Sequence, residues 1–515
     1  MNIQRLIILV FVVFAAVHTL ANGKAEHTVL VVWDGMRPDF VSPELTPTLW
    51  QLRTNGVWFA NHHSAYPTST KVNGATLATG LYPQHHNILG NSEYRPQIDP
   101  FSSFGTDNLK QVRLGDALMG NKYLGGPTLA ELVAAQRQST AVAGTKEVAL
   151  FQDRLPRADT GSTNPVLFRD DTLPHSLWDE LVKRLGKPPE SKSPNEQRDL
   201  WTTRALTRVI WEKQIPRYSL LWLSEPDLTQ HKHGPGSREA LDAIRGSDRN
   251  LAHVLDALAK HGKRDKTDLI VISDHGFSSI TANADVKKIL QRAGLKVEQK
   301  FEHPPRQGDI LMVGLGGSAL LYVIGHGTNV IQRAVTALQQ EPTTGVICTR
   351  LALPGTFPLS EVRLDAPHAP DIIISFNWNR SPVGQTAGSL AHEANADAKI
   401  TGGTHTSLSP FDTHNLCVAA GPDFRVGVTN TTPTGNIDIM PTISWLLGIT
   451  PKPKTDGRVM MEVLTRSTGD APKTTTRTLQ TSITVPRGEW SQHLTITEVE
   501  GVRYLDEGNG EFKAK

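Results

Sequence analysis

The strongest constraint on the fold is a set of short apolar runs that lack polar alternation. These runs occupy residues 27–33 (HTVLVVW), 219–224 (SLLWLS), 268–273 (DLIVIS) and 415–420 (NLCVAA). Such runs are typical of strands that are buried on both faces. Between the second and third runs, apolar residues from Leu241 to Leu258 recur at helical spacing. This alternation predicts an α/β fold with a doubly wound, mostly parallel central sheet and helices on both faces.

Other segments suggest how the chain is divided. Thr46 and Pro47 have the pattern of a helix start, and Gly56 would end that helix. We expect a catalytic domain over residues 26–465, in which residues 281–400 break the alternation and form an inserted small α+β subdomain. Residues 466–515 are expected to form a peripheral β-rich tail of short strands with a turn at Gly508-Asn509-Gly510.

The first residues have the features of an export signal. Arg5 lies in a short basic region, residues 6–20 are almost entirely apolar, and small residues follow at Ala21, Gly23 and Ala25. The apolar run is short for a membrane span, so residues 1–25 are predicted to be a cleaved signal peptide of a secreted or periplasmic protein. No stable membrane span is then expected after cleavage. The alternative is an uncleaved segment that stays associated with a membrane.

Charge and cysteine content restrict the partners. The 53 basic and 51 acidic residues give a net charge of +2, so no overall field favours nucleic acid. Attraction for an anionic substrate must therefore be local. Cys348 and Cys417 are the two cysteines, and either one disulfide or two buried thiols is compatible with the sequence. No sequence feature indicates an oligomeric state.

Acidic residues and histidines gather where the predicted strands end. The carboxyl ends of strands in an open α/β sheet meet at one crevice, where ligands bind. Three carboxylates and three imidazoles suit Zn²⁺, or Mn²⁺ and Fe²⁺, better than Ca²⁺. Six ligands exceed the needs of one tetrahedral ion, so two divalent ions roughly 4 Å apart are expected. The residues concerned are Asp34, Asp227, His231, Asp274, His275 and His405.

A hydroxyl group is the candidate nucleophile. Thr70 lies in the segment 67–74 (PTSTKVNG), just before an Ala- and Thr-rich stretch that ends at Gly80. A helix N-terminus there would attract a phosphoryl group. Thr70 would need activation by a metal ion, because a threonine hydroxyl is a weak nucleophile. The alternative is that Thr68, Ser69 and Thr70 only cap the helix.

The motifs together resemble the nucleotide pyrophosphatase/phosphodiesterase branch of the alkaline phosphatase superfamily, over roughly residues 29–447. They are 34–39 (DGMRPD), 66–70 (YPTST) with Asn73, 79–83 (TGLYP), 225–227 (EPD) with His231, 273–276 (SDHG) and 403–405 (GTH). The resemblance implies an alkaline-phosphatase-like fold and an exported two-metal phosphoester hydrolase with a covalent threonine intermediate. It also implies phosphodiesterase or nucleotide pyrophosphatase activity on a small phosphorylated substrate.

The resemblance further implies a role for each site residue. Asp34, Thr70, Asp274 and His275 would bind one zinc ion, and Asp227, His231 and His405 would bind the other. Asn91 would hydrogen-bond a phosphoryl oxygen. The backbone NH of Lys71, the residue after the nucleophile, would contribute to the same oxyanion site.

The substrate remains open because the chain departs from the family beside Thr70. Lys71 and Val72 stand where the family usually has an aromatic residue and proline. A second lysine, Lys146, resembles a lysine that monoesterase and phosphonate-hydrolase relatives direct at the phosphoryl group. Added ammonium groups favour a dianionic monoester over a diester. A phosphomonoesterase or phosphonate hydrolase is therefore the alternative function, unless both lysines face solvent.

Readings from other classes are less consistent with the sequence. Export argues against a phosphomutase of the same superfamily, and the complete ligand set argues against a metal-stabilised binding protein. The pairs His62-His63 and His85-His86 are not expected to share a metal, because adjacent side chains diverge. His414 is an alternative to His405 as the last ligand.

Overall fold

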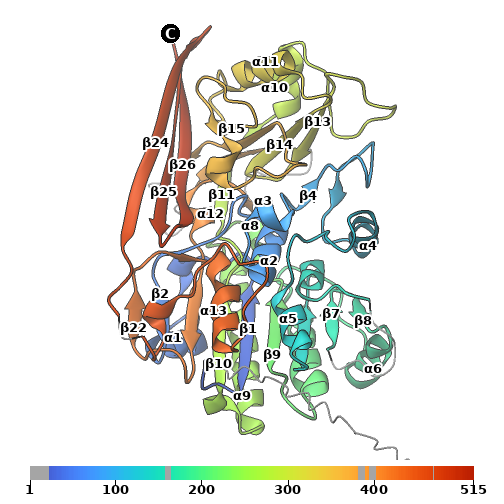
Figure 1. Cartoon of the computed structure of the whole chain (residues 1–515), viewed down its shortest axis with the longest axis vertical. Coiled ribbons are helices and arrows are strands. Elements are labelled where there is room, and N and C mark those ends of the chain that lie inside the picture. Colours follow the sequence, from blue (N-terminus) through green and yellow to red (C-terminus); the bar gives the residue numbers. More distant parts are fainter. Residues whose placement is uncertain (1–21, 157–163, 381–388, 394–401, 468) are drawn as a thin grey trace, which may run out of the picture.

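The computed structural model describes residues 22–156, 164–380, 389–393, 402–467 and 469–515. Most of the predicted signal peptide lies outside these residues. A nine-stranded sheet forms the centre of the molecule (Figure 1). Its strands, in spatial order, are β22 (Val428–Asn430), β2 (Val57–Phe59), β21 (Cys417–Ala420), β10 (Thr267–Ile272), β1 (His27–Trp33), β9 (Tyr218–Leu223), β6 (Thr140–Gly144), β7 (Val166–Phe168) and β8 (Asp171–Leu173).

The central sheet is mostly parallel. The five strands from β10 to β7 pair in parallel, whereas β21 is antiparallel to both of its neighbours and β8 is antiparallel to β7. The predicted strand at 415–420 is therefore present as β21, but it runs against the others. An antiparallel strand in a largely parallel sheet is common in large sheets.

Helices cover both faces of this sheet. In β1, Leu30 and Val32 point into one apolar core, and Val29 and Val31 point into the other. The first core is closed by α2 (Thr70–Thr79), α5 (Leu129–Ala135) and α13 (Ile439–Leu446), and the second by α1 (Pro47–Thr54), α7 (Glu196–Arg204) and α9 (Arg238–Lys260). The predicted α/β architecture is confirmed.

The start of α1 is stabilised differently from the sequence-based expectation. The hydroxyl of Thr46 donates to the carbonyl oxygen of Ser42 and makes no cap to the helix. Instead, the Asp248 carboxylate of α9 accepts hydrogen bonds from the backbone N–H groups of Thr48 and Leu49, at 3.0 and 2.9 Å. A carboxylate from a neighbouring helix therefore takes over the role that sequence alone assigns to a local hydroxyl.

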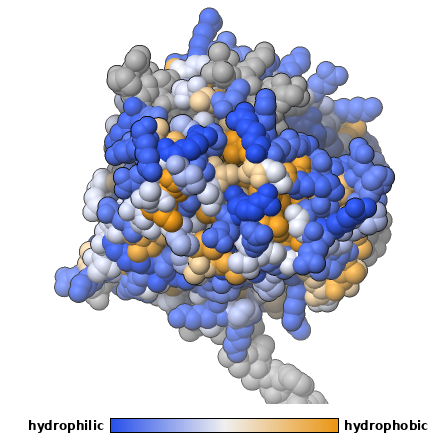
Figure 2. Space-filling view, turned by 90° about the horizontal axis from the view of Figure 1, so that it is seen from above, coloured by the Kyte–Doolittle hydropathy of each residue, from blue (hydrophilic) through white to orange (hydrophobic). Residues whose placement is uncertain are grey.

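The segment expected to be an inserted subdomain contains a second, six-stranded sheet. Its strands, in spatial order, are β12 (Val297–Glu298), β13 (Ile310–Gly314), β14 (Ser318–Val323), β17 (Ile372–Phe376), β15 (Thr344–Thr349) and β16 (Phe357–Pro358). The helices α10 (Val286–Arg292) and α11 (Thr328–Leu338) share an apolar core with this sheet. Seen from above in Figure 2, the surface is largely hydrophilic, with smaller apolar patches between the polar residues.

The C-terminal residues form a three-stranded antiparallel sheet of β24 (Thr474–Val485), β25 (Gly488–Val499) and β26 (Val502–Ala514). It packs against the six-stranded sheet (Figure 1), and Gln492 of β25 bonds both backbone groups of Ile347 in β15. These strands are longer than expected. The predicted turn at 508–510 is wrong, because these residues lie inside β26. A side chain at Gly510 would come within 1.9 Å of the carbonyl oxygen of Gly345, so glycine allows the two strands to approach.

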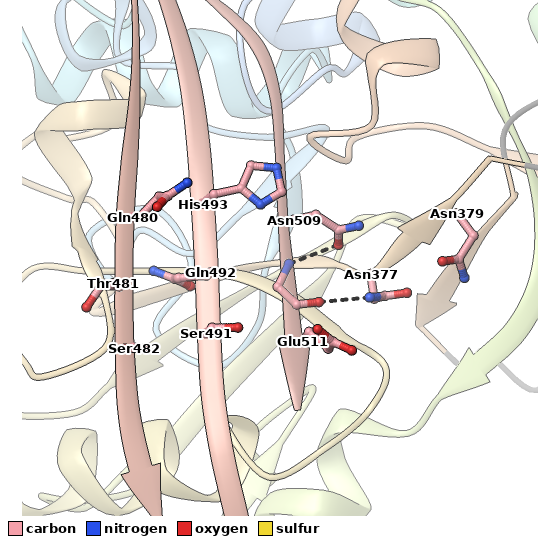
Figure 3. Close-up of a pocket in the computed structure, with 11 residues that line it drawn as sticks. Asn377, Asn379, Gln480, Thr481, Ser482, Ser491, Gln492, His493, Asn509 and Glu511 are labelled. Atoms are coloured by element: carbon pink, nitrogen blue, oxygen red, sulfur yellow. Dashed lines mark hydrogen bonds between the residues drawn. The ribbon is translucent and has the colours of Figure 1, made fainter. Parts of the chain in front are cut away.

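A polar cavity of about 680 Å³ lies between the C-terminal sheet and the segment after β17 (Figure 3). Its lining includes five amide side chains, and three of them have hydrogen bonds to the backbone. Asn377 donates to the carbonyl oxygen of Gly510, Asn509 donates to that of Trp378, and Gln492 bonds Ile347 as described above. This cavity contains none of the predicted site residues.

Cys348 and Cys417 are both buried and free. The alternative of two buried thiols therefore holds. Among the helices of the described residues, none has the length and apolar character needed to span a membrane.

Candidate metal centre and active site

The predicted ligands meet at the carboxyl end of the central sheet. Asp34 follows β1, Asp227 follows β9 at the start of α8 (Asp227–His233), and Asp274 and His275 follow β10. His405 follows β20 (Gly403–Thr404), a strand outside the central sheet. Because β10, β1 and β9 are adjacent and parallel, their ends bring all three carboxylates together.

Two overlapping ligand clusters result. One contains Asp34, Asp274 and His275, and the other contains Asp227, His275 and His405. Nε2 of His275 lies 3.3 Å from Asp274 Oδ2 and 3.6 Å from Asp34 Oδ1. Two ligands bonded to one tetrahedral zinc ion are about 3.3–3.5 Å apart, given bond lengths near 2.0–2.1 Å. These separations therefore suit ligands that share an ion.

The second cluster has a similar geometry. Asp227 Oδ1 lies 3.2 Å from Nε2 of His231 and 3.6 Å from Nε2 of His405. The His275 and His405 rings stack with centroids 3.7 Å apart, so the two clusters are in contact. His231 lies beside the second cluster through its contact with Asp227, and its side chain is partly exposed.

Backbone carbonyl groups orient all three imidazoles in the same way. Nδ1 of His231 faces the carbonyl oxygen of Gly403 at 3.1 Å, and Nδ1 of His275 faces that of Gly276 at 2.8 Å. Nδ1 of His405 faces the carbonyl oxygen of Thr68 at 2.7 Å. Each ring therefore donates through Nδ1 and presents the lone pair of Nε2 to the centre. This outer arrangement is typical of metal-binding histidines.

Three buried carboxylate oxygens point into the centre without a hydrogen-bond partner. They are Oδ1 of Asp34, Oδ1 of Asp227 and Oδ2 of Asp274. Burial and repulsion from Asp274 raise the pKa of Asp34 to about 8, and burial raises that of Asp274 to about 7. The other oxygens of Asp34 and Asp227 pair with the Lys146 ammonium, but buried carboxylate oxygens that lack a partner are costly unless a cation joins them. The donor set therefore fits divalent metal ions.

Thr70 is the first residue of α2, and its position explains why its hydroxyl faces the centre. Its Oγ1 lies 3.2 Å from Nε2 of His275, inside the first cluster. Ser69 occupies the cap position in extended conformation, yet its hydroxyl makes no cap to the helix. The hydroxyl of Thr68 donates instead to the carbonyl oxygen of Ser407. None of the three hydroxyls caps α2.

Asn91 lies beside Thr70 and contacts the start of α2. Its Oδ1 accepts the backbone N–H of Lys71 at 2.9 Å. The hydrogen of that N–H is therefore engaged by Asn91 rather than directed at the centre. The amide nitrogen of Asn91 is left as the group that can donate to a substrate.

The two lysines have different surroundings. Nζ of Lys71 pairs with Asp107 at 2.6 Å, which neutralises its charge. Nζ of Lys146 lies 2.7 Å from Asp227 and 3.0 Å from Asp34, one carboxylate from each predicted ion site. Burial would lower the pKa of Lys146, but Asp227 and Asp34 raise it, so the ammonium stays charged. Those two contacts place it at the centre, and neither lysine is a solvent-facing residue.

A cavity of about 320 Å³ opens onto the centre. Thr70, Asn91 and both lysines line it, and Arg169 and Arg198 lie on its wall. Among the described residues that line this cavity, none is phenylalanine, tyrosine or tryptophan. The cavity therefore offers several cationic side chains but no broad aromatic surface.

Several supporting residues were not predicted. The indole N–H of Trp222 in β9 donates to Asp34 Oδ2 at 2.8 Å, and the amide of Asn436 donates to the carbonyl oxygen of Asp274 at 2.8 Å. The buried Asp199 accepts three hydrogen bonds from Ser224 and Glu225, which fixes the turn that carries Asp227. The tryptophan in a buried run was the one available signal, because a buried indole N–H needs an acceptor.

Two known proteins are similar in sequence to about half of this chain. Mouse ectonucleotide pyrophosphatase/phosphodiesterase family member 1 is 29% identical over 259 residues, which cover 50% of this chain and 24% of the relative. Venom phosphodiesterase CdcPDE of Crotalus durissus collilineatus is 25% identical over 268 residues, or 51% of this chain and 28% of the relative. These matches span about a quarter of the relatives' length.

A solved structure supports the fold independently. Murine ectonucleotide pyrophosphatase/phosphodiesterase 5 superposes with a TM-score of 0.61 at 17% identity, covering 85% of this chain and all of that one. At this sequence identity the match supports the fold only, not the function. Residues 28–407, by contrast, match a sequence family directly, and by that match the chain belongs to the type I phosphodiesterase / nucleotide pyrophosphatase family.

Proposed function

We propose that this chain is an exported hydrolase of phosphoesters that uses two divalent metal ions, with Zn²⁺ as the first candidate, and Thr70 as nucleophile. The phosphodiesterase or nucleotide pyrophosphatase activity named for the family is the leading assignment. The observation that carries the proposal is the contact of Thr70 with a centre of three inward-facing imidazoles and three unpaired carboxylate oxygens. The names of the relatives, which include a venom protein and an ectoenzyme, support export.

The two ions would be held by separate ligand sets. Asp34, Thr70, Asp274 and His275 would bind one, and Asp227, His231 and His405 would bind the other. When bound, these ions lower the pKa of the attacking hydroxyl and stabilise negative charge on the phosphoryl group and the leaving oxygen. His275, which belongs to both clusters, would link the two sets.

The chain's own residues would then carry the reaction. Thr70 Oγ1 would lose its proton and attack phosphorus, so that an Oγ1–P bond forms while the P–O bond to the leaving group breaks and the leaving oxygen takes up a proton from solvent. The oxygen of a water molecule would next bond to phosphorus, and one of its protons would return to Thr70 Oγ1 as the Oγ1–P bond breaks, which restores the hydroxyl and releases the second product. The amide nitrogen of Asn91 would donate to a phosphoryl oxygen, and the N-terminus of α2 would favour the added negative charge.

The assignment is tested by hydrolysis of bis(p-nitrophenyl) phosphate. We expect the zinc-loaded chain to release p-nitrophenol, and a chelator followed by dialysis to remove that activity. Adding Zn²⁺ back should restore it, whereas Ca²⁺ should not, because nitrogen ligands suit Ca²⁺ poorly. Turnover that persists in a chain shown by elemental analysis to lack metal would refute the proposal.

A phosphomonoesterase or phosphonate hydrolase is the second candidate, and a specific observation favours it. The ammonium of Lys146 lies at the centre, and the described lining of the cavity lacks a large aromatic side chain for a nucleobase to stack on. A dianionic monoester would gain more from this cation than a monoanionic diester.

The variant Lys146→Ala separates the two candidates. A hydrogen bond to a charged group contributes about 1.5–3 kcal/mol, so loss of this ammonium should lower kcat/KM for p-nitrophenyl phosphate by at least about tenfold. If the diester is the natural substrate type, the loss for bis(p-nitrophenyl) phosphate will equal or exceed that for the monoester. A loss confined to the monoester supports the second candidate. Lys71→Ala is the matched comparison, because its charge is already paired with Asp107, and it should affect both esters alike.

A further inference from the structure

A second group of metal-type ligands lies outside the active centre. His63 in β3 (His62–His63), His414 just after α12 (Pro410–Thr413) and Asp506 in β26 each bring one ligand atom within 4.8 Å of the other two. None of the three is among the residues of the phosphoester site. These side chains come from three segments far apart in sequence, and Asp506 belongs to the C-terminal sheet.

The hydrogen-bond partners of His63 imply that a cation lies beside one of its ring nitrogens. Its Nδ1 lies 3.0 Å from the carbonyl oxygen of Thr434, and its Nε2 lies 2.9 Å from Asp506 Oδ1. Both nitrogens therefore face acceptors, whereas a neutral imidazole can donate from only one of them. If Nδ1 donates to Thr434, Nε2 directs a lone pair at a carboxylate. A cation between Nε2 and Oδ1, either a proton or a metal ion, resolves this repulsion.

His414 adds a second imidazole to this pair. Its ring lies 4.4 Å from that of His63, and one of its nitrogens lies within 4.8 Å of the ligand atoms of His63 and Asp506. A proton would link only His63 and Asp506, whereas a metal ion would use all three ligand atoms. A backbone carbonyl group holds Nδ1 of His63, as in the histidines of the phosphoester site.

We propose that His63, His414 and Asp506 form a third site for a divalent transition metal such as Zn²⁺, which fastens the C-terminal sheet to the catalytic part of the chain. Two imidazoles and one carboxylate are an ordinary ligand set for zinc, and water would supply the fourth ligand. The Asp506 side chain is 19% exposed, so solvent has access. The ion would act beside direct contacts of the same strand, such as the hydrogen bond from Thr413 to the carbonyl oxygen of Asp506.

The test is the zinc content per chain after saturation with Zn²⁺ and removal of excess metal. We expect His414→Ala to hold one ion fewer than wild type and to keep its hydrolytic activity, because the active centre is untouched. Asp506→Asn, which preserves the shape of the side chain, should lose the same single ion. Zinc should also raise the Tm of wild type by more than that of either variant, because the third ion links two parts of the fold.

His493→Ala is the matched control, since His493 is a partly exposed histidine on the neighbouring strand β25. It should keep the wild-type zinc content. Equal zinc content in wild type, His414→Ala and Asp506→Asn would overturn the proposal and leave a His63–Asp506 ion pair as the explanation. Loss of an ion in His493→Ala would also overturn it, since the extra ion would then be bound elsewhere. The difference between variants does not depend on how many ions the active centre holds.

Discussion

Replacing Thr70 by alanine should reduce kcat/KM for bis(p-nitrophenyl) phosphate by at least about 10³-fold, because it removes the hydroxyl that contacts the candidate ligand His275. Of the neighbouring hydroxyls, that of Thr68 donates to the carbonyl oxygen of Ser407, and that of Ser69 is buried without a hydrogen-bond partner, so neither bonds a candidate ligand. Zinc content should fall by at most a small amount, since six further ligands remain. The measurement is steady-state turnover by zinc-loaded protein, with the metal content of each sample determined in parallel.

Two variants make this result specific to the nucleophile. Thr79→Ala removes the same hydroxyl from the last turn of α2, where it donates to the carbonyl oxygen of Ala75 and accepts the backbone N–H of Leu81, and should leave turnover within about twofold of wild type. Thr70→Ser retains a hydroxyl and should retain measurable activity. If Thr70→Ala kept most of the wild-type turnover, the threonine intermediate would have to be abandoned and water would become the direct nucleophile.

The fold was predictable because strand burial leaves a direct mark on the sequence. The run that forms β1 is apolar from Val29 to Trp33, because Leu30 and Val32 enter one core while Val29 and Val31 enter the other. Strand direction leaves no such mark, so the strand β21 was predicted but its antiparallel direction was not. The prediction of a turn at 508–510 was wrong for a related reason. Glycine permits a tight turn and the close approach of another strand equally well, and only the tertiary position of Gly510 beside Gly345 decides between them.

The meeting of the candidate ligands was predictable because they follow strands, whereas their supporting residues were not predictable. Asp34, Asp227 and Asp274 follow three recognisable strands, and parallel pairing makes their meeting a matter of topology. Trp222 and Asn436 reach the centre through contacts that link residues 162 or more positions apart. No local pattern encodes such contacts. His63 and His414 illustrate the same limit, because a pairing with Asp506 of the C-terminal sheet is invisible until the chain is folded.

Asp274→Asn should remove the ion of the first cluster and almost all activity. The amide keeps the size of the side chain but replaces a ligand oxygen that has no other partner. A bound cation supplies several kcal/mol of transition-state stabilisation. Since about 1.4 kcal/mol corresponds to a factor of ten, the expected loss in kcat/KM is about 10³-fold. Zinc content should fall by one ion per chain, and hydrolysis of diester and monoester should fall together.

The same strand offers a matched control. Asp268 lies at the opposite end of β10, where burial and the neighbouring Asp423 raise its pKa to about 8. At neutral pH that side chain is therefore largely protonated, and Asp268→Asn exchanges one neutral group for another of similar shape. Zinc content and turnover should match those of wild type. Both variants change a buried aspartate, Asp268 within β10 and Asp274 just after it, so a defect shared by the two would indicate damage to the sheet. A defect confined to Asp274→Asn would identify its carboxylate as a metal ligand, because of these two only Asp274 belongs to a ligand cluster, with Asp34 and His275.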